Sequence, residues 1–169
     1  MEALVVFESM WGNTEKVAHA VAAGLAESME VTTVDVSRAP SEVGAEFGLI
    51  VAGGPTHAFS MSRASTRQEA GAKGADEGNV HTGMREWLQS LPARDDLWVA
   101  TFDTRVASVR HLPGSAAKAA AREVRRRRLG QVVATESFYV ADTAGPLLDG
   151  ELDRARAWGT SLTLGRQHR

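Results

Sequence analysis

The segment from Glu8 to Thr14 carries the densest set of hydrogen-bonding groups in the chain. It offers two hydroxyls, one amide and a glycine directly before a helical pattern. The free N–H groups and the positive dipole end at the start of a helix bind anions without lysine or arginine. Capping by Asn13 or Thr14 would explain part of this composition, whereas the density of donors favours a phosphate site. The patterns G-x-G-x-x-G and G-x-x-x-x-G-K-[ST] are both absent, so the segment is neither a dinucleotide fingerprint nor a P-loop.

Two further segments are expected beside the first, because each follows an apolar run. They span residues 53–62 and 101–113. Ligands of open parallel sheets bind beyond the carboxyl ends of the strands, so the three segments should meet at one edge of the sheet.

Both segments hold candidate ligand contacts with structural alternatives. His57 or Phe59 could cover one face of a planar ring. The alternatives are a solvated loop histidine and a phenylalanine buried against the residues that follow. The backbone of Thr101 to Asp103 could bond a polar ligand edge, whereas Asp103 and Arg105 could instead pair with each other or with nearby loops.

Short apolar or β-branched runs alternate with stretches of helical spacing. The predicted strands are residues 3–7, 30–36, 48–52, 97–102 and 131–140. The predicted inward helical faces are Val17, Ala18, Val21, Ala22 and Leu25; Met84, Trp87, Leu88 and Leu91; Ala117, Ala120, Ala121 and Val124; and Leu152, Ala155, Trp158, Gly159 and Leu162, after an Asp149 cap. This alternation predicts an α/β fold with a three-layer, doubly wound, five-stranded parallel sheet in a single domain of residues 1–169.

Glycine and proline mark two irregular places in this pattern. Gly53, Gly54 and Pro55 are expected to end the third strand. Residues 60–80 have no apolar period and contain three glycines, so they are expected to form a long surface loop.

The composition excludes several kinds of chemistry. The 169 residues include no cysteine, which excludes disulfides, thiolate metal sites and a cysteine nucleophile. None of the five histidines forms a close pair, so a histidine metal site has little support. No apolar run reaches the length of a membrane span, and no basic region precedes the first apolar run, so a cytoplasmic protein without membrane association is expected.

The net charge of −2 hides an uneven distribution. Residues 1–50 are acidic overall, whereas residues 105–169 are basic, largely through Arg122 and the run from Arg125 to Arg128. This run is typical of the end of a helix, where cations interact with the dipole, although docking of an acidic partner is an alternative. No aromatic residues are interleaved with it, which argues against a nucleic-acid partner.

Residues 9–14 resemble the FMN-phosphate loop of flavodoxins, whose usual pattern is [ST]-x-T-G-N-T-E. The match includes Ser9, Gly12, Asn13, Thr14 and Glu15. Trp11 departs from the pattern, and an aromatic residue there is similar to the flavodoxin-like quinone reductases, as is the Gly-Pro-Thr start of the second segment. The resemblance implies a flavodoxin-like strand order of 2-1-3-4-5 and noncovalent FMN. The implied cofactor contacts are Ser9, Met10, Trp11, Gly12, Asn13, Thr14, Pro55, Thr56, His57, Ala58, Phe59, Thr101, Phe102 and Asp103.

Three functions are compatible with this resemblance. The first is an FMN-binding electron carrier between a reductase and an acceptor protein, as a monomer or weak dimer. The second is an FMN-dependent quinone reductase or porphyrinogen oxidase-like flavoenzyme, with residues 60–80 beside the substrate. The third is a flavodoxin-fold module without flavin. No catalytic residue is identified, and whether the chain is an enzyme stays open, with a carrier favoured.

Overall fold

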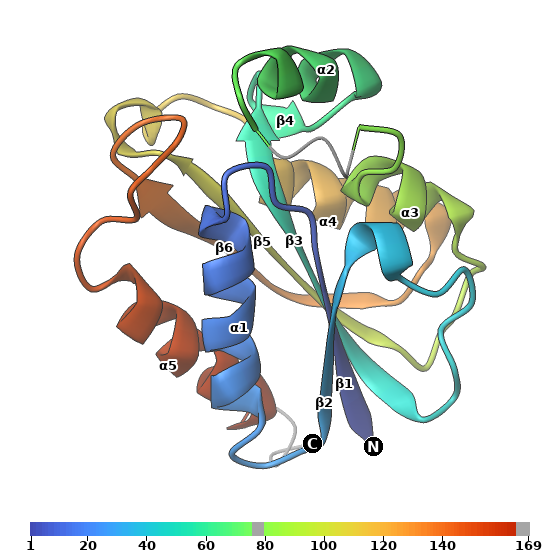
Figure 1. The fold of residues 1–169 in the computed structure, drawn as a ribbon. Coiled ribbons are helices and arrows are strands. Elements are labelled where there is room, and N and C mark those ends of the chain that lie inside the picture. Colours follow the sequence, from blue (N-terminus) through green and yellow to red (C-terminus); the bar gives the residue numbers. More distant parts are fainter. Residues whose placement is uncertain (76–79, 165–169) are drawn as a thin grey trace.

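The computed structural model describes residues 1–75 and 80–164. Its sheet has the strand order β2-β1-β3-β5-β6, all paired in parallel, and β4 pairs antiparallel with the end of β3 (Figure 1). The strands are β1 (Glu2–Phe7), β2 (Val31–Asp35), β3 (Phe47–His57), β4 (Ser60–Met61), β5 (Trp98–Val106) and β6 (Gln131–Val140). The predicted α/β parallel sheet is confirmed. Its five-stranded order was incomplete because it missed β4, although the parallel strands alone follow the order 2-1-3-4-5.

Helices cover both faces of this sheet. α1 (Asn13–Leu25) and α5 (Glu151–Leu164) pack on one face, and α3 (Met84–Ser90) and α4 (Ala116–Arg127) on the other. α2 (Ala64–Ala72) lies beside β4 at the carboxyl end of the sheet (Figure 1). Short 3-10 helices, η1 (Val36–Arg38) and η3 (Ala107–Val109), follow β2 and β5. None of the described helices is long and apolar enough to cross a lipid bilayer.

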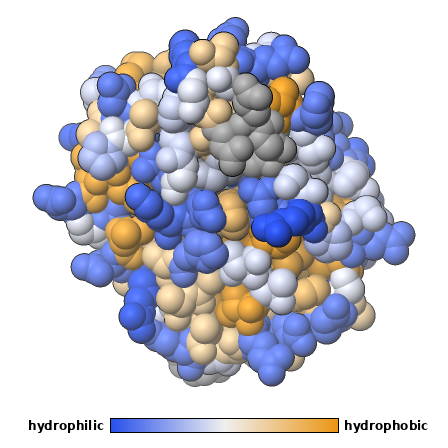
Figure 2. Space-filling model, in the orientation of Figure 1, coloured by the Kyte–Doolittle hydropathy of each residue, from blue (hydrophilic) through white to orange (hydrophobic). Residues whose placement is uncertain are grey.

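The central strands are buried on both faces, which explains their unbroken apolar runs. Along β1, Leu4 and Val6 join the core beneath α3 and α4, whereas Ala3, Val5 and Phe7 join the core beneath α1 and α5. On the face seen in Figure 2, hydrophilic side chains separate small hydrophobic areas. The apolar surface on this face is therefore divided rather than continuous.

The third strand continues through Gly53, Gly54 and Pro55, so the prediction that these residues end it was wrong. β1 pairs with β3 only as far as Gly53, and β4 pairs with β3 only from Thr56, so Pro55 is paired on the β5 side and lies between these two partners on the other side. Proline lacks an N–H group, and it is tolerated where a strand has a free edge.

Residues 60–72 contain regular secondary structure that the sequence did not predict. The segment contains β4 and the nine-residue helix α2, so the prediction of a surface loop was wrong for this part. Residues 76–79 of the predicted loop lie outside the described residues.

The start of the last helix differs from the prediction as well. α5 begins at Glu151, whose Oε2 accepts a hydrogen bond of 2.7 Å from the N–H of Tyr139. This position therefore faces the sheet, and the next residue, Leu152, is 43% exposed rather than buried. The N–H of Arg154 donates to the carbonyl of Gly150, at 3.0 Å, so Gly150 rather than the predicted Asp149 precedes the helix as its cap.

Gly53 and Gly54 differ in how much space surrounds them, which gives a direct test of the extended strand. A Cβ atom at Gly53 would lie 2.0 Å from the Phe102 ring, whereas one at Gly54 would lie 3.7 Å from the Cβ of Glu8. Overpacking of a core costs about 1–3 kcal/mol. Gly53→Ala should lower the free energy of unfolding by at least this amount in urea denaturation. Gly54→Ala is the matched control and should change it by less than about 0.5 kcal/mol; equal losses would contradict this packing.

Candidate functional site

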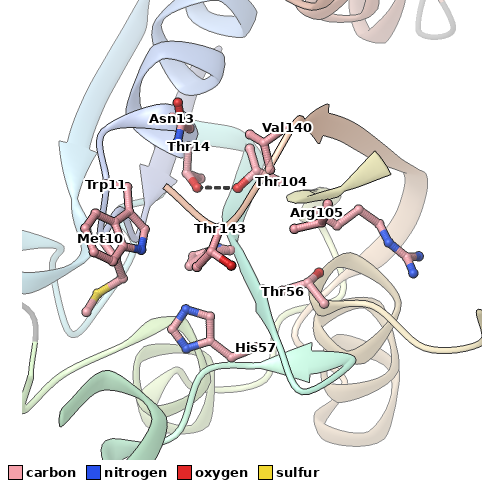
Figure 3. A pocket seen from close by; sticks show the side chains of 12 residues that line it. Met10, Trp11, Asn13, Thr14, Thr56, His57, Thr104, Arg105, Val140 and Thr143 are labelled. Atoms are coloured by element: carbon pink, nitrogen blue, oxygen red, sulfur yellow. Dashed lines mark hydrogen bonds between the residues drawn. The ribbon is translucent and has the colours of Figure 1, made fainter. Parts of the chain in front are cut away.

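A cleft lies at the carboxyl ends of β1, β3 and β5, where the sequence places its candidate residues (Figure 3). The lining residues come from the last residues of β3, β5 and β6, from the loops after β1 and β6, and from the start of α1. They are Met10, Trp11, Asn13, Thr14, Pro55, Thr56, His57, Thr104, Arg105, Val106, Val140 and Thr143. The structure therefore brings together seven of the predicted contacts from the first two segments, with Asn13 and Thr14 at the start of α1.

Ser9 shapes the loop that leads into α1. Its Oγ accepts hydrogen bonds from the N–H of Gly12, at 3.1 Å, and of Glu15, at 3.4 Å. Gly12 has a φ of 87°, a left-handed conformation that glycine adopts without steric cost. The hydroxyl of Ser9 and the freedom of Gly12 together turn the chain into the helix.

The N–H groups of Asn13 and Thr14 have no acceptor among residues 1–75 and 80–164. They belong to the first turn of α1, where N–H groups project beyond the helix end. The Nδ2 of Asn13 donates to the carbonyl of Ala144, at 3.2 Å, so the side chain does not cap its own helix. The helix end can therefore receive an anion.

Thr14 also joins α1 to the centre of the sheet. Its Oγ1 lies 2.7 Å from the Oγ1 of Thr104 on β5, and both side chains line the cleft (Figure 3). Thr104 was not among the predicted contacts, because the third segment was expected to leave the sheet at residue 101. β5 continues to Val106, so the polar edge of the site moves to residues 104–106.

His57 forms the wall of the cleft that faces Trp11 (Figure 3). Its Nδ1 lies 3.1 Å from the Oγ1 of Thr66 on α2. Burial lowers the pKa of His57, and the positive charge of Arg67 lowers it further, whereas Glu69 opposes the shift. The neutral imidazole is therefore favoured, and the alternative of a solvated loop histidine is not what the structure has.

Ala58 and Phe59 form a tight turn between β3 and β4. Both have left-handed backbone conformations, with φ values of 47° and 61°. The Phe59 side chain is 46% exposed and does not line the cleft, so its alternative of burial against the following segment was wrong.

Thr101, Phe102 and Asp103 lie within β5, paired to β3 on one side and β6 on the other. The Oγ1 of Thr101 donates to the carbonyl of Ala117, and Phe102 packs in the core. The Oδ2 of Asp103 accepts from the N–H of Ala117, and burial raises the pKa of this carboxyl. Thr101 and Phe102 therefore lie in a strand, as the predicted strand of residues 97–102 has them, whereas the prediction that Asp103 lies beyond the strand was wrong.

Arg105 does not pair with Asp103 across a salt-bridge distance, contrary to one alternative. Its Nη2 instead donates to the carbonyls of Val109 and Leu112, at 3.0 and 3.2 Å, in the loop after β5. The other alternative, contact with a nearby loop, is the one that the structure has.

Val140, the last residue of β6, and Thr143, in the segment that follows, also line the cleft, and neither was among the predicted contacts. A signal was present: residues 142–146 hold polar residues, a glycine and a proline directly after a predicted strand. The carboxyl end of that strand must lie at the same edge as the others, because the strands are parallel.

The arginine run lies at the C-terminal end of α4. Arg125, Arg126 and Arg127 form its last turn, as the helix-end interpretation predicts. The left-handed residue that ends the helix is Arg128, with a φ of 55°, rather than Gly130. Among the described residues, no group of three or more histidine, aspartate or glutamate side chains could hold a metal ion.

The cleft fits a phosphate better than it encloses a large ring. Its enclosed volume is about 70 Å³, below the roughly 300 Å³ of pockets that bury small molecules. The donors at the start of α1 suit a phosphate group. A planar ring system would have to lie across the open mouth, between Trp11 and His57.

Comparisons with known proteins agree with this geometry. The family model described as Flavodoxin matches residues 5–65. A search of curated proteins finds no match. A flavodoxin from the domain Archaea has a similar structure, with a TM-score of 0.65, 18% identity, and coverage of 99% of this chain and 100% of the other.

Two other solved structures are also similar. Oxidised flavodoxin 1 from Bacillus cereus gives a TM-score of 0.61 at 15% identity, and covers 100% of this chain and 99% of its own. A flavone reductase gives a TM-score of 0.60 at 12% identity, with 99% of this chain and 64% of the other covered. The family resemblance carried by residues 9–14 is thereby confirmed, and the fold is that of the flavodoxins.

The environment of His57 predicts its titration. Its pKa should lie below the ordinary value of 6.5, because burial and Arg67 disfavour the imidazolium. Two-dimensional NMR of the histidine ring protons measures this directly, with His57→Gln to assign the signal. Since the unfolded chain binds this proton more readily, His57 should reduce stability as the pH falls through about 6.5 and below. A pKa above 6.5 would contradict the buried position.

Proposed function

Given the confirmed resemblance of this chain to the flavodoxin family, we propose that it binds FMN noncovalently and carries electrons between a reductase and an acceptor protein. The observation that carries the proposal is the start of α1. Asn13 and Thr14 line the cleft there, and their two N–H groups have no acceptor within the described part of the chain. We further propose that it acts in the cytoplasm.

Different residues of the cleft would contact different parts of the cofactor. The N–H groups of Asn13 and Thr14 would hold the phosphate, with Ser9 keeping the loop in shape. Trp11 and His57, which both line the cleft, would contact the ring. Bound FMN supplies one- and two-electron redox chemistry, and the protein tunes it through hydrogen bonds, charge and exposure to solvent.

Two features favour a carrier. The mouth of the cleft is open, so a flanked ring would keep an edge within reach of a partner protein. Residues 1–104, which supply most of the cleft, are acidic overall, with 15 acidic and 7 basic residues. Negative charge disfavours addition of electrons to a flavin, which suits a donor of low potential.

A second candidate is an FMN-dependent reductase of a planar substrate such as a quinone. It is favoured by Trp11, by the helix α2 beside the cleft wall, and by the fold shared with a flavone reductase. The related porphyrinogen oxidase-like activity and a module without flavin remain the other proposals.

The phosphate site can be tested by comparing FMN with riboflavin, which lacks the phosphate. Thr14→Ala should weaken FMN binding by about 1–3 kcal/mol, because hydrogen bonds to a charged group are lost. Riboflavin binding should change much less. Fluorescence titration measures both affinities, with the exposed Ser65→Ala on α2 as the control. Equal losses for both ligands would place the phosphate elsewhere, and a chain that binds neither would overturn the proposal.

Carrier and enzyme differ in whether the protein needs a reductase. A carrier loaded with FMN should oxidise NADPH in the presence of a quinone only after a separate flavodoxin reductase is added. Absorbance of NADPH reports the rate, and the chain without FMN is the blank. Rapid NADPH oxidation by the FMN-loaded protein without added flavodoxin reductase would instead favour the second candidate, an FMN-dependent quinone reductase.

A further inference from the structure

Helix α2 is attached to the domain in an unusual way. Of its nine residues, all of which the structure describes, the one that is buried is Arg67, whose exposure is 0%. Neither hydrophobic core contains a residue of α2. By contrast, α4 buries five residues, four of them alanines. The polar contacts of one arginine therefore take the place of an apolar face.

Those contacts use the whole guanidinium group of Arg67. Nη2 donates to Oε1 of Glu86 at 2.7 Å, and Nη1 donates to the Oγ of Ser62 at 2.9 Å. Nε donates to the carbonyl of Val80 at 3.0 Å. The planar fork of arginine suits this geometry, and lysine could not reproduce it.

Ser62 links Arg67 to Glu8, the residue before the loop of residues 9–14. Its Oγ–H donates to Oε2 of Glu8 at 2.5 Å, and Oε1 of Glu8 accepts the N–H of Met84 at 2.7 Å. Glu8 is 1% exposed and directly precedes Ser9, which shapes the loop. A Cβ atom at Gly83 would lie 2.4 Å from Nη1 of Arg67, so these groups are closely packed.

The charges in this network are balanced by contact. Burial raises the pKa of Glu8, although hydrogen bonds from Ser62 and Met84 and the charge of Arg67 oppose the shift. Burial acts in the same direction on Glu86, but the hydrogen bonds and charge of Arg67 together with backbone hydrogen bonds lower the pKa of Glu86 overall. An arginine buried without these partners would be strongly disfavoured.

α2 in turn contacts the cleft wall. Thr66, the neighbour of Arg67, has its Oγ1 3.1 Å from the Nδ1 of His57. The position of α2 therefore determines which hydrogen-bond partner His57 has, and so how its ring is oriented at the mouth of the cleft.

We propose that Arg67 is a positioning residue of the cleft, which holds α2 against Glu8 and Glu86 and thereby orients His57 toward the bound ring. The part of this inference that concerns the ring rests on the proposed function. The part that concerns α2 and His57 concerns the chain by itself, and is tested without flavin.

The first experiment uses the chain without added flavin. Arg67→Gln should speed amide hydrogen exchange of residues 64–72 by about tenfold or more, because α2 has no buried apolar residue to hold it. The amides of α1 and α4 should keep their protection. The pKa of His57, followed by NMR, should rise toward 6.5, since both burial and the charge of Arg67 are lost. Gln68→Ala, an exposed change on the same helix, is the control. Unchanged exchange and an unchanged His57 titration would overturn the proposal.

A second variant covers the case in which Arg67→Gln does not fold. The side chain of Glu86 is 37% exposed, so Glu86→Gln removes the charge partner without burying a new void. It should speed exchange in α2 in the same way, and protection equal to the parent chain would again overturn the proposal. Arg67→Lys keeps the charge but not the fork, so it should restore little of the protection.

FMN affinity completes the test. Thr66→Val removes the partner of His57 and should weaken FMN binding about 5- to 10-fold, whereas Thr66→Ser, which keeps the hydroxyl, should bind like the parent chain. Equal affinity in Thr66→Val and Thr66→Ser would overturn the link to the ring. If the parent chain binds no FMN, the proposed function fails, while hydrogen exchange and the His57 titration still decide the role of Arg67.

Discussion

Parallel pairing of the strands is the constraint on which the rest of this structure depends. Because β1, β3, β5 and β6 run in one direction, their carboxyl ends meet at one edge, and the segments that follow them converge there. The same pairing requires helical crossovers, which place the start of α1 at that edge with its N–H groups outward. The contact between Thr14 and Thr104, 90 residues apart, is a direct result.

The two faces of the sheet and its carboxyl edge are held by different forces. Apolar side chains of the central strands anchor α1, α3, α4 and α5, and the close approach of α1 to α5 depends on Gly24, where a Cβ would lie 2.1 Å from the carbonyl of Arg156. At the carboxyl edge, α2 is held by hydrogen bonds and ion pairs around Arg67. Binding sites at such an edge can be adjusted without disturbing the core, because the two sets of contacts are separate.

The ends of the strands are where prediction from local sequence pattern and the structure differ. The apolar runs located each parallel strand, but β3 and β5 continue past them to His57 and Val106. The extra residues include glycine, proline and aspartate, which alone disfavour a strand. They are extended because a neighbouring strand supplies hydrogen bonds, as Pro55 opposite Thr104 illustrates. Propensity is a local property, whereas pairing depends on the partner.

The sequence by itself determined the parallel α/β fold, the flavodoxin resemblance of residues 9–14 and the basic end of α4, because each depends on neighbours along the chain. Only the tertiary structure decided that Thr104 and Thr143 line the cleft, and that Asp103 belongs to the sheet. It alone also placed Arg67 within reach of Ser62 and Glu86, and Ser62 within reach of Glu8. A charged residue in a polar helix is typical of a solvated surface, and the burial of Arg67 depends on Ser62, Val80 and Glu86, which meet it only in the folded chain.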